Sequence, residues 1–278
     1  GDFMIVIACP GQGAQTPGFL APWLELPTFA DSLTLMQEAS GIDLKSHGTI
    51  SDADTIRDTA VAQPLIVAAG VACVSALFDG KSPKSQGIAG VAGHSVGEIT
   101  AAVTAGIFSS EDGIKFVRER GNAMAKAAAL ETTSMAAVLG GDEAIVLARL
   151  AELDLTPANY NGGGQIVAAG SAEAISALVA EGLAGARVIP LQVAGAFHTR
   201  YMQPAVSTLA AYSSNLSPAN PEISIWSNQA GQLVDSGQEY LELLVSQVSN
   251  PVRWDLCMQA MVNAGVTALI EVSPAGTL

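Results

Sequence analysis

The pentapeptide Gly93-His94-Ser95-Val96-Gly97 fits the G-x-S-x-G pattern of a nucleophile elbow, a sharp turn that holds a serine between a strand and a helix. The apolar run from Ile88 to Ala92 precedes this turn, and a helical pattern begins near Val96. Such a short pattern also arises by chance in a chain with 28 glycines. The strand-turn-helix context therefore carries the prediction that Ser95 is a nucleophile.

A serine hydroxyl is a poor nucleophile at neutral pH and needs a base within hydrogen-bond reach. The chain has three histidines. His47 lies in a polar segment, and the turn at His94 directs its side chain away from the adjacent serine. His198, in the segment Gly195-Ala196-Phe197-His198, remains as the predicted base. A lone histidine in an apolar setting is more often structural, so the pairing with Ser95 carries this assignment.

The other ring nitrogen of His198 needs an acceptor that fixes the imidazole tautomer. No Asp or Glu lies at an obvious triad position. The helix predicted over Gln238 to Ser249 must end before Pro251, which leaves its last carbonyl groups without helical partners. We therefore predict a Ser-His dyad whose third member is the main-chain carbonyl near Gln247.

An acyl-transfer serine also needs donors for the oxyanion, normally the N–H of the next residue and one from a neighbouring loop. The next residue is Val96. The loop Gly11 to Gln15 follows the first predicted strand, Met4 to Ala8, at the expected carboxyl edge of a parallel sheet. Gln12 is the candidate for the second donor, although an ordinary strand-to-helix turn fits this loop equally well.

The helix predicted over Glu111 to Ala129 carries two arginines on different faces. At about 100° per residue, Arg120 lies on the apolar side and Arg118 on the polar side. A buried arginine needs an anionic partner. That partner is either a structural carboxylate or a substrate carboxylate, which a guanidinium binds through two parallel hydrogen bonds.

The order of predicted elements places these residues in two subdomains. Up to about residue 130, and again after His198, strands alternate with helices, which indicates parallel α/β layers. Between Ser134 and Val193 the order is βαββαβ, typical of a ferredoxin-like unit. We expect an α/β fold in which residues 1–130 and 196–278 form the parallel-sheet core and residues 131–195 form an inserted ferredoxin-like subdomain.

Composition excludes several function classes. The chain of 278 residues has 26 acidic and 12 basic residues, a formal charge of −14, which excludes a nucleic-acid binder that relies on a basic surface. Apolar residues make up 49%, which predicts a large core. Cys9, Cys73 and Cys257 form no CxxC pair, which predicts reduced thiols in a cytoplasmic protein and no metal site.

Two further segments have structural interpretations. Val61 to Phe78 is the longest apolar stretch, but Gln63 and Pro64 interrupt it, whereas a membrane span needs about 18 uninterrupted apolar residues. We predict a buried helix with Pro64 in its first turn, and no membrane partner. Gly162-Gly163-Gly164 lies between two predicted strands and predicts a turn rather than a phosphate-binding loop.

Together, these motifs resemble those of the malonyl-CoA:acyl carrier protein transacylases of bacterial fatty acid synthesis over nearly the whole chain. The resemblance rests on Pro10 to Gln15, Gln63-Pro64, Gly93 to Glu98, Arg120-Gly121 with Met124, Asn159 to Asn161, Gly195 to His198 and Gln247 to Trp254. It implies an α/β-hydrolase-like parallel-sheet core with a ferredoxin-like insert, which agrees with the element order above. The family continues with a glycine-rich turn and a helix after the positions of Glu271 to Leu278, so we expect those last elements, but no motif residue, to be missing from this sequence.

The resemblance also implies residue roles. Ser95 would carry the malonyl group, His198 would be the base, oriented by Gln247, and Arg120 would hold the malonyl carboxylate. The oxyanion donors would be Gln12 and Val96, and further substrate-binding positions would be Met124, Asn161 and Phe197. In related polyketide acyltransferases, phenylalanine before the histidine generally accompanies a preference for malonyl, so Phe197 predicts selection against an α-methyl group.

The implied reaction moves malonyl from malonyl-CoA to the phosphopantetheine thiol of holo acyl carrier protein, with no cofactor of the enzyme's own, and we expect a monomer. A serine hydrolase, a non-catalytic carrier-binding module and a polyketide acyltransferase remain as alternatives. The net charge of −14 opposes both CoA and an acidic carrier protein, so we expect a local basic patch, with Arg200 and Arg253 as candidates.

Overall fold

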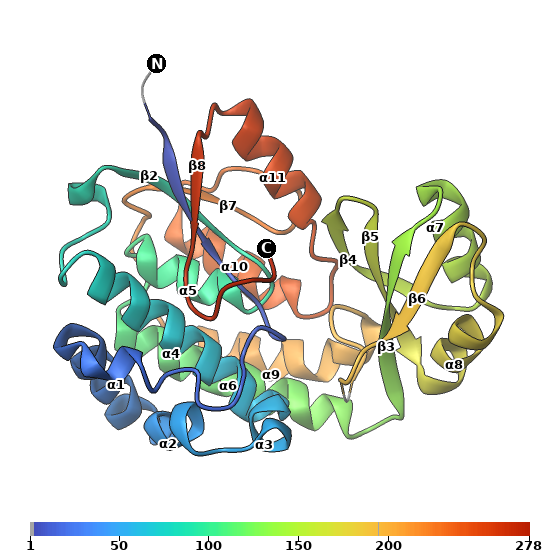
Figure 1. The fold of residues 1–278 in the computed structure, drawn as a ribbon, viewed down its shortest axis with the longest axis horizontal. Helices are drawn as coiled ribbons and strands as arrows, with labels where there is room; N and C mark the ends of the chain where they lie inside the picture. Colours follow the sequence, from blue (N-terminus) through green and yellow to red (C-terminus); the bar gives the residue numbers. More distant parts are fainter. Residues whose placement is uncertain (1–2, 194) are drawn as a thin grey trace.

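The computed structural model describes residues 3–193 and 195–278, and its named strands form two separate sheets (Figure 1). The parallel sheet has the order β7-β2-β1-β8, with β1 at Ile5–Cys9, β2 at Ile88–Gly93, β7 at Ser224–Trp226 and β8 at Ala268–Glu271. The antiparallel sheet has the order β4-β5-β3-β6, with β3 at Thr133–Gly140, β4 at Thr156–Gly162, β5 at Gln165–Ser171 and β6 at Ala186–Pro190. The predicted α/β fold with a small antiparallel subdomain is confirmed.

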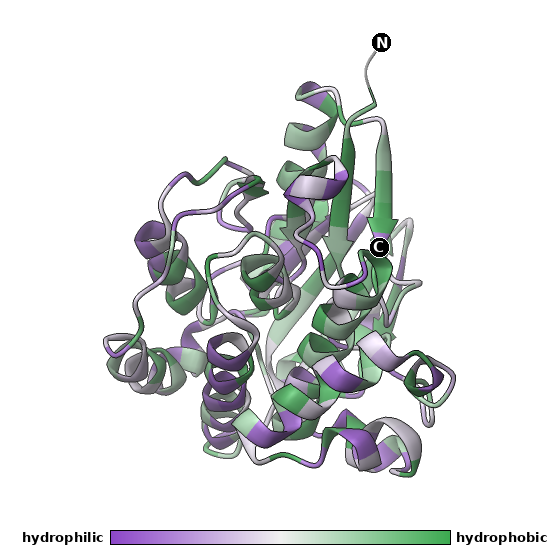
Figure 2. Ribbon diagram, turned by 90° about the vertical axis from the view of Figure 1, so that its left-hand side faces the viewer, coloured by the Kyte–Doolittle hydropathy of each residue, from purple (hydrophilic) through white to green (hydrophobic). Residues whose placement is uncertain are grey.

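The parallel sheet is covered by helices on both faces. Ile7 and Cys9 of β1 face the main core, which includes the long helices α4 (Thr59–Leu77) and α6 (Ser110–Ala128). Val6 and Ala8 pack on the other face in a cluster with α11 (Trp254–Asn263). Successive side chains of a strand point to opposite faces, so a strand that is buried on both is a continuous apolar run. In Figure 2 the strand that follows the N-terminus, β1, is accordingly mostly green.

The remaining helices surround these layers or lie on the small sheet. They are α1 (Pro27–Ser40), α2 (Leu44–Thr49), α3 (Ala53–Arg57), α5 (Gly97–Thr104), α7 (Glu143–Glu152), α8 (Ala172–Glu181), α9 (Gln203–Ser213) and α10 (Gly237–Gln247), with short 3-10 helices at Trp23–Glu25, Lys84–Gln86 and Arg200–Met202.

Helix α4 is buried as predicted, but the expected position of Pro64 is wrong. The side chain of Asp58 caps the helix by accepting a hydrogen bond from the Ala60 N–H, so the helix begins at Thr59 and Pro64 lies in its second turn. Proline there lacks the N–H that would bond the Ala60 carbonyl, and its ring crowds that carbonyl, so this turn of the helix is not closed by the usual hydrogen bond. This helix is long and apolar enough to cross a membrane, yet 72% of its most apolar window is buried inside the protein, so its hydropathy reflects the core.

The small subdomain follows the predicted order β3-α7-β4-β5-α8-β6. Leu150 of α7 and Leu178 of α8 are fully buried with Val138 of β3 in a core of their own. Gly163 and Gly164 form the turn between β4 and β5, directly after Gly162 at the end of β4, and all three have positive φ, so the predicted turn is confirmed. We propose residues 131–195 as the bounds of this subdomain, and 1–130 with 196–278 as those of the parallel one; residues 1, 2 and 194 lie outside the described residues.

Candidate active site

Ser95 lies in the tight turn that joins β2 to α5. Its φ is +55°, in the left-handed region where a residue with a Cβ is strained. A Cβ on Gly97 would lie 2.2 Å from the carbonyl oxygen of Cys9, and one on Gly93 would lie 2.2 Å from the carbonyl carbon of Gly97. Only glycine fits at either position, so the close approach of the backbone explains the two glycines of the motif.

The side chain of His198 contacts this serine from the segment that precedes the 3-10 helix Arg200–Met202. Its Nε2 lies 2.8 Å from Oγ of Ser95, and its Nδ1 lies 2.8 Å from the carbonyl oxygen of Gln247. The ring is only 4% exposed, and burial, with a second contribution from the charge of Arg120, lowers its pKa to about 3. A neutral ring that donates from Nδ1 to the carbonyl presents an unprotonated Nε2 to the hydroxyl. The structure thus brings together three groups that the sequence placed in one site.

Asn228 ties the elbow to the neighbouring strand β7. Its Oδ1 accepts a hydrogen bond from the Ser95 N–H at 2.9 Å, and its Nδ2 donates to the Gly93 carbonyl at 2.7 Å. The side chain is fully buried. Because β7 and β2 are parallel neighbours, residues that follow them meet at one edge of the sheet. The Ser95 N–H is therefore occupied by Asn228 and cannot serve as an oxyanion donor.

The two predicted oxyanion donors lie at this same edge. None of the residues that the structure describes accepts a hydrogen bond from the Val96 N–H, which opens helix α5. Gln12 follows β1, whose last residue Cys9 pairs with Gly93 of β2. Gln12 and Val96 line the same cavity as Ser95.

Arg120 lies on the buried side of α6, as the helical spacing predicted, and is 2% exposed. Its Nη1 donates to Oε1 of Gln63 at 2.8 Å and its Nη2 donates to Oε1 of Gln247 at 2.7 Å. Burial lowers its pKa only to about 10, so the guanidinium stays charged at neutral pH. Both partners are neutral amides, and within the described ranges no carboxylate forms an ion pair with it. Of the two partners that the sequence left open for Arg120, a structural carboxylate in direct contact is therefore excluded within the described residues.

Glu98 is linked to Arg120 through the side chain of Gln247. The Nε2 of Gln247 donates to Oε1 of Glu98 at 2.6 Å, and the other carboxylate oxygen accepts from the Asn228 N–H at 2.9 Å. Glu98 is 1% exposed, and burial raises its pKa to about 7 against the opposing effect of these hydrogen bonds. Gln247 thus contacts His198 through its backbone and connects Arg120 to Glu98 through its side chain.

Ser95, His198 and Arg120 line one cavity of about 700 Å³, whose walls come from both subdomains, whereas Asn228, Glu98 and Gln247 lie behind its wall. The remaining predicted substrate-binding residues, Met124, Asn161 and Phe197, also line it. Oδ1 of Asn161 lies 2.7 Å from Nε2 of His94, so the His94 ring faces β4 of the small subdomain, whereas the sequence predicted only that it points away from Ser95. A cavity of this size fits the range of small-molecule sites.

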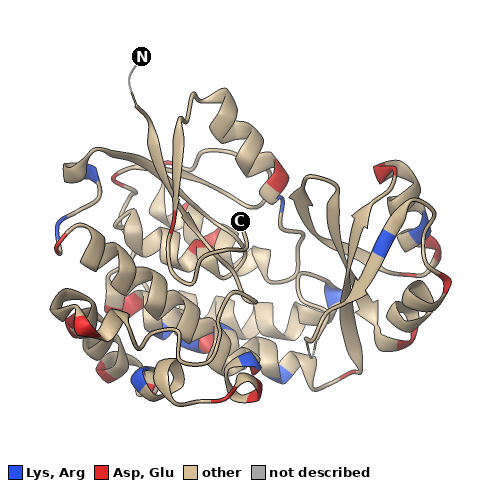
Figure 3. Cartoon of the chain, in the orientation of Figure 1, with Lys and Arg blue, Asp and Glu red and all other residues tan. Residues whose placement is uncertain are grey.

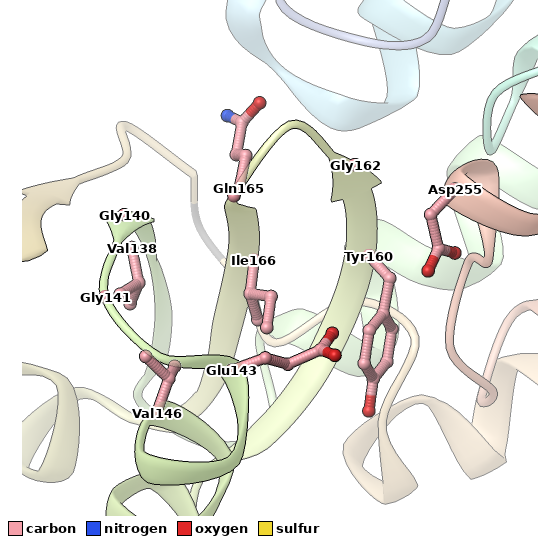
Figure 4. A pocket seen from close by; sticks show the side chains of 11 residues that line it. Val138, Gly140, Gly141, Glu143, Val146, Tyr160, Gly162, Gln165, Ile166 and Asp255 are labelled. Atoms are coloured by element: carbon pink, nitrogen blue, oxygen red, sulfur yellow. The ribbon is translucent and has the colours of Figure 1, made fainter.

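A second cavity, of about 210 Å³, lies between the small subdomain and α11. Figure 4 shows the side chain of Glu143 directed toward Tyr160, with Asp255 nearby. None of the predicted site residues lines this cavity. It adjoins the cavity around Ser95 at Gln165, which lines both.

The two arginines suggested for a basic patch are both partnered. Arg200 forms an ion pair with Asp154 at 2.9 Å, and Arg253 forms one with Asp255 at 2.9 Å. The Arg253 guanidinium also lies 4.1 Å from the centre of the Tyr160 ring. Neither arginine lines the large cavity.

Comparison with known proteins places this site in a family. A family model described as an acyl transferase domain matches residues 6–278. The malonyl CoA-acyl carrier protein transacylase of Mycobacterium tuberculosis (strain ATCC 25618 / H37Rv) is 48% identical over 275 residues, which cover 99% of this chain and 91% of that relative. The chain belongs to the malonyl CoA-acyl carrier protein transacylase family.

Other members of the transacylase family agree in sequence and fold. The transacylase of Escherichia coli (strain K12) is 34% identical over 278 residues, which cover 97% of this chain and 88% of that relative. The crystal structure of the M. tuberculosis enzyme superposes with a TM-score of 0.95 at 48% identity, covering 99% of this chain and 91% of the other. The resemblance drawn from the motifs is thus confirmed.

Sequence reasoning about this transacylase did not single out Asn228, and it gave Glu98 no role. Asn228 lies 133 residues from the N–H that it binds, and the preceding strand β7 has three residues, so no local pattern identifies it. Glu98 follows the elbow directly in the sequence. An acidic residue in the first turn of a helix is usually explained by its favourable interaction with the helix dipole. The sequence therefore gave no reason to expect that Glu98 is buried.

Proposed function

We propose that this chain transfers a malonyl group from malonyl-CoA to the phosphopantetheine thiol of acyl carrier protein, through a malonyl-Ser95 intermediate, in fatty acid biosynthesis. The observation that carries the proposal is the hydrogen-bonded series from Ser95 Oγ through His198 to the Gln247 carbonyl, which opens into a cavity that also contains the charged Arg120. The transacylases of M. tuberculosis and E. coli, at 48% and 34% identity, support the same reaction.

Each half of the reaction uses the same pair of residues. Nε2 of His198 takes the proton of Ser95 as Oγ attacks the thioester carbonyl; the carbon–sulfur bond then breaks and the proton passes to the departing CoA sulfur. In the second half the phosphopantetheine thiol gives its proton to His198 and attacks the ester carbonyl. The bond from the carbonyl carbon to Oγ then breaks, and His198 returns the proton to Oγ, which restores Ser95. The N–H groups of Val96 and Gln12 stabilise the oxyanion in both halves.

The substrate is held by residues on the cavity wall. Arg120 binds the malonyl carboxylate through its guanidinium, a charge-assisted contact that an acetyl group cannot make. Gln63 and Gln247 hold the guanidinium from behind, so little side-chain entropy is lost when the substrate binds. Met124 and Asn161 complete the wall.

The assay of choice is intact-protein mass spectrometry after mixing with malonyl-CoA, before and after adding holo acyl carrier protein. A malonyl adduct that passes to the carrier supports the transferase. Free malonate released without the carrier would indicate a serine hydrolase. The absence of any adduct would leave a non-catalytic carrier-binding module.

The cellular setting completes the proposal. The three cysteines are free and buried, which supports a reducing compartment, and we place the enzyme in the cytoplasm as a monomer. A malonyl transacylase bound to the holo acyl-carrier protein of a type II polyketide synthase has a TM-score of 0.87 at 28% identity, covering 96% of this chain and 88% of the other. That similarity supports the acyl carrier protein as the acceptor.

Phe197 is expected to select malonyl over methylmalonyl. The ring is 7% exposed on the cavity wall, next to the base, and one methyl group changes binding in such a pocket by about 1–3 kcal/mol. Phe197→Leu is expected to raise methylmalonyl turnover relative to malonyl by up to about tenfold, measured as the ratio of kcat/KM values. Phe108→Leu, which shortens a buried phenylalanine outside the cavity, is the control. Comparable use of both substrates by the wild-type enzyme would contradict this role.

The acylation rate is expected to hold at mildly acidic pH. An imidazole with the ordinary pKa of about 6.5 would lose about tenfold in rate one pH unit below that value. Burial lowers the pKa of His198 to about 3, so single-turnover acylation is expected to change less than about twofold between pH 7.5 and 5.5.

The same shift has a consequence for stability. Below about pH 6.5 the unfolded chain binds a proton at this histidine that the folded chain does not bind, so the contribution of His198 to stability decreases as the pH falls toward 3. Circular dichroism at each pH separates unfolding from lost base function. A tenfold fall in acylation of the folded enzyme would show that the imidazole titrates normally.

A further inference from the structure

The side-chain charges on the wall of the large cavity have one sign. Arg57 and Arg120 line it, and of the described residues around it none is Asp or Glu. This contrasts with a chain that has 26 acidic and 12 basic residues, whose charges are spread over helices and loops in Figure 3. The smaller cavity has the opposite character, because its lining includes Glu143 and Asp255 but no lysine or arginine. Two cations in the large cavity favour a ligand with anionic groups.

The two arginines lie at different depths. Arg120 is 2% exposed and is held by two amides, whereas the Arg57 side chain is 43% exposed. Arg57 pairs with Asp54 on its own helix, at 2.9 Å, and that carboxylate is 89% exposed. An exposed pair of this kind contributes little to stability, about 0–1 kcal/mol, because water screens it. Asp54 therefore leaves the Arg57 guanidinium free to bind another anion.

The backbone at Arg57 is attached to the loop that carries the proposed oxyanion donor. Nε2 of Gln12 donates to the Arg57 carbonyl at 3.3 Å, and Nε2 of Gln15 donates to the adjacent Ile56 carbonyl at 3.1 Å. Arg57 is the last residue of the short helix α3, which the Asp52 side chain caps. These contacts fix the backbone of Arg57 beside the Gln12 loop, and its exposed side chain lines the cavity.

We propose that Arg57 binds a phosphate ester of the thioester substrate, at the end opposite the carboxylate that Arg120 binds. The inference rests on the proposed function. Malonyl-CoA and the holo carrier protein both carry a pantetheine arm esterified to phosphate. When the acyl end of that arm reaches Ser95, the phosphate end must lie toward the opening, where Arg57 is exposed. A guanidinium matches the geometry of phosphate oxygens through paired hydrogen bonds.

The test compares substrates with and without the phosphate. Arg57→Ala is expected to lower kcat/KM for malonyl-CoA by about tenfold or more, mainly through KM, and to leave malonyl-pantetheine, which lacks phosphate, within about twofold of the wild type. Arg57→Lys is expected to recover part of the loss, because it retains the charge without the fork. Arg149→Ala is the control: Arg149 also pairs with a carboxylate three residues away, Glu152, and in addition with Glu181, but lies outside the cavity lining.

A binding measurement tests the contact without turnover. Arg57→Ala is expected to weaken binding of CoA, and not of pantetheine, in equilibrium titrations. An equal loss for both ligands would show that Arg57 only supports the local fold, and no loss for either would show that it does not contact phosphate; both results overturn the proposal. If the wild-type enzyme forms no malonyl adduct, the proposed function fails, whereas the titrations still decide the phosphate contact.

The second half-reaction distinguishes whether Arg57 binds the phosphate of CoA alone or also that of the carrier protein. Enzyme charged with malonyl-pantetheine is mixed with holo carrier protein, and the rate of transfer is followed. A slower transfer by Arg57→Ala supports a contact that serves the carrier's phosphodiester as well as CoA. An unchanged transfer rate, with the CoA effect present, supports a contact with the CoA diphosphate alone.

Discussion

Ser95→Ala is expected to abolish the malonyl adduct and to lower malonyl transfer by about 10⁴-fold or more, as removal of the nucleophile does in serine enzymes that use an attacking hydroxyl. Oγ of Ser95 lies 2.8 Å from Nε2 of His198, and the structure offers no second hydroxyl at that nitrogen within the described residues. Alanine keeps the Cβ, so the strain at φ +55° is the same in both proteins. The loss is therefore one of chemistry rather than of folding.

The comparison needs a serine that has no part in the site. Ser207→Ala on α9 is such a control, because its hydroxyl is exposed and contacts only the Gln203 carbonyl of its own helix. Intact-protein mass spectrometry with malonyl-CoA is expected to show one adduct in this control and none in Ser95→Ala. A malonyl adduct that persists in Ser95→Ala would place the nucleophile elsewhere and would end the dyad assignment.

The parts of the site that the sequence predicted are those encoded locally or by elimination. The elbow follows from two glycines flanking a serine after an apolar strand, and His198 follows because the other two histidines had reasons to be excluded. The carbonyl of Gln247 was predicted from Pro251, which ends the helix and leaves carbonyl groups unpaired. The structure places that carbonyl 2.8 Å from the ring. Each of these inferences used one segment at a time.

The parts that the sequence did not predict depend on contacts between distant segments. Asn228 reaches the Ser95 N–H from another strand, and the Gln247 side chain joins Arg120 to Glu98 across three helices. Helices α1 to α3 were also not predicted individually, because their short, mixed sequences have weak periodicity. Contacts of this kind form only when distant segments pack together, and a single sequence does not show which segments will meet.

The same network supports the proposal that Arg120 selects the acyl group. Its two hydrogen-bond partners, Gln63 and Gln247, are neutral, and the nearest linked carboxylate, Glu98, is reached only through the Gln247 amide. The charge is thus buried without direct neutralisation, a costly arrangement that a substrate carboxylate would relieve. Acetyl groups carry no charge, so we expect the proposed contact with Arg120 to discriminate between the two acyl groups.

Arg120→Ala is expected to lower the preference for malonyl-CoA over acetyl-CoA by about ten- to a hundredfold, since a hydrogen bond to a charged group contributes roughly 1.5–3 kcal/mol. The measurement is the ratio of kcat/KM values for the two thioesters. Arg120→Lys keeps the charge but not the planar fork, so it is expected to fall between the wild type and alanine. Thermal unfolding is followed in parallel, because the variant leaves two amide oxygens without their donor. Equal losses for malonyl and acetyl would mean that Arg120 acts by holding Gln247, and hence His198, rather than by binding the carboxylate.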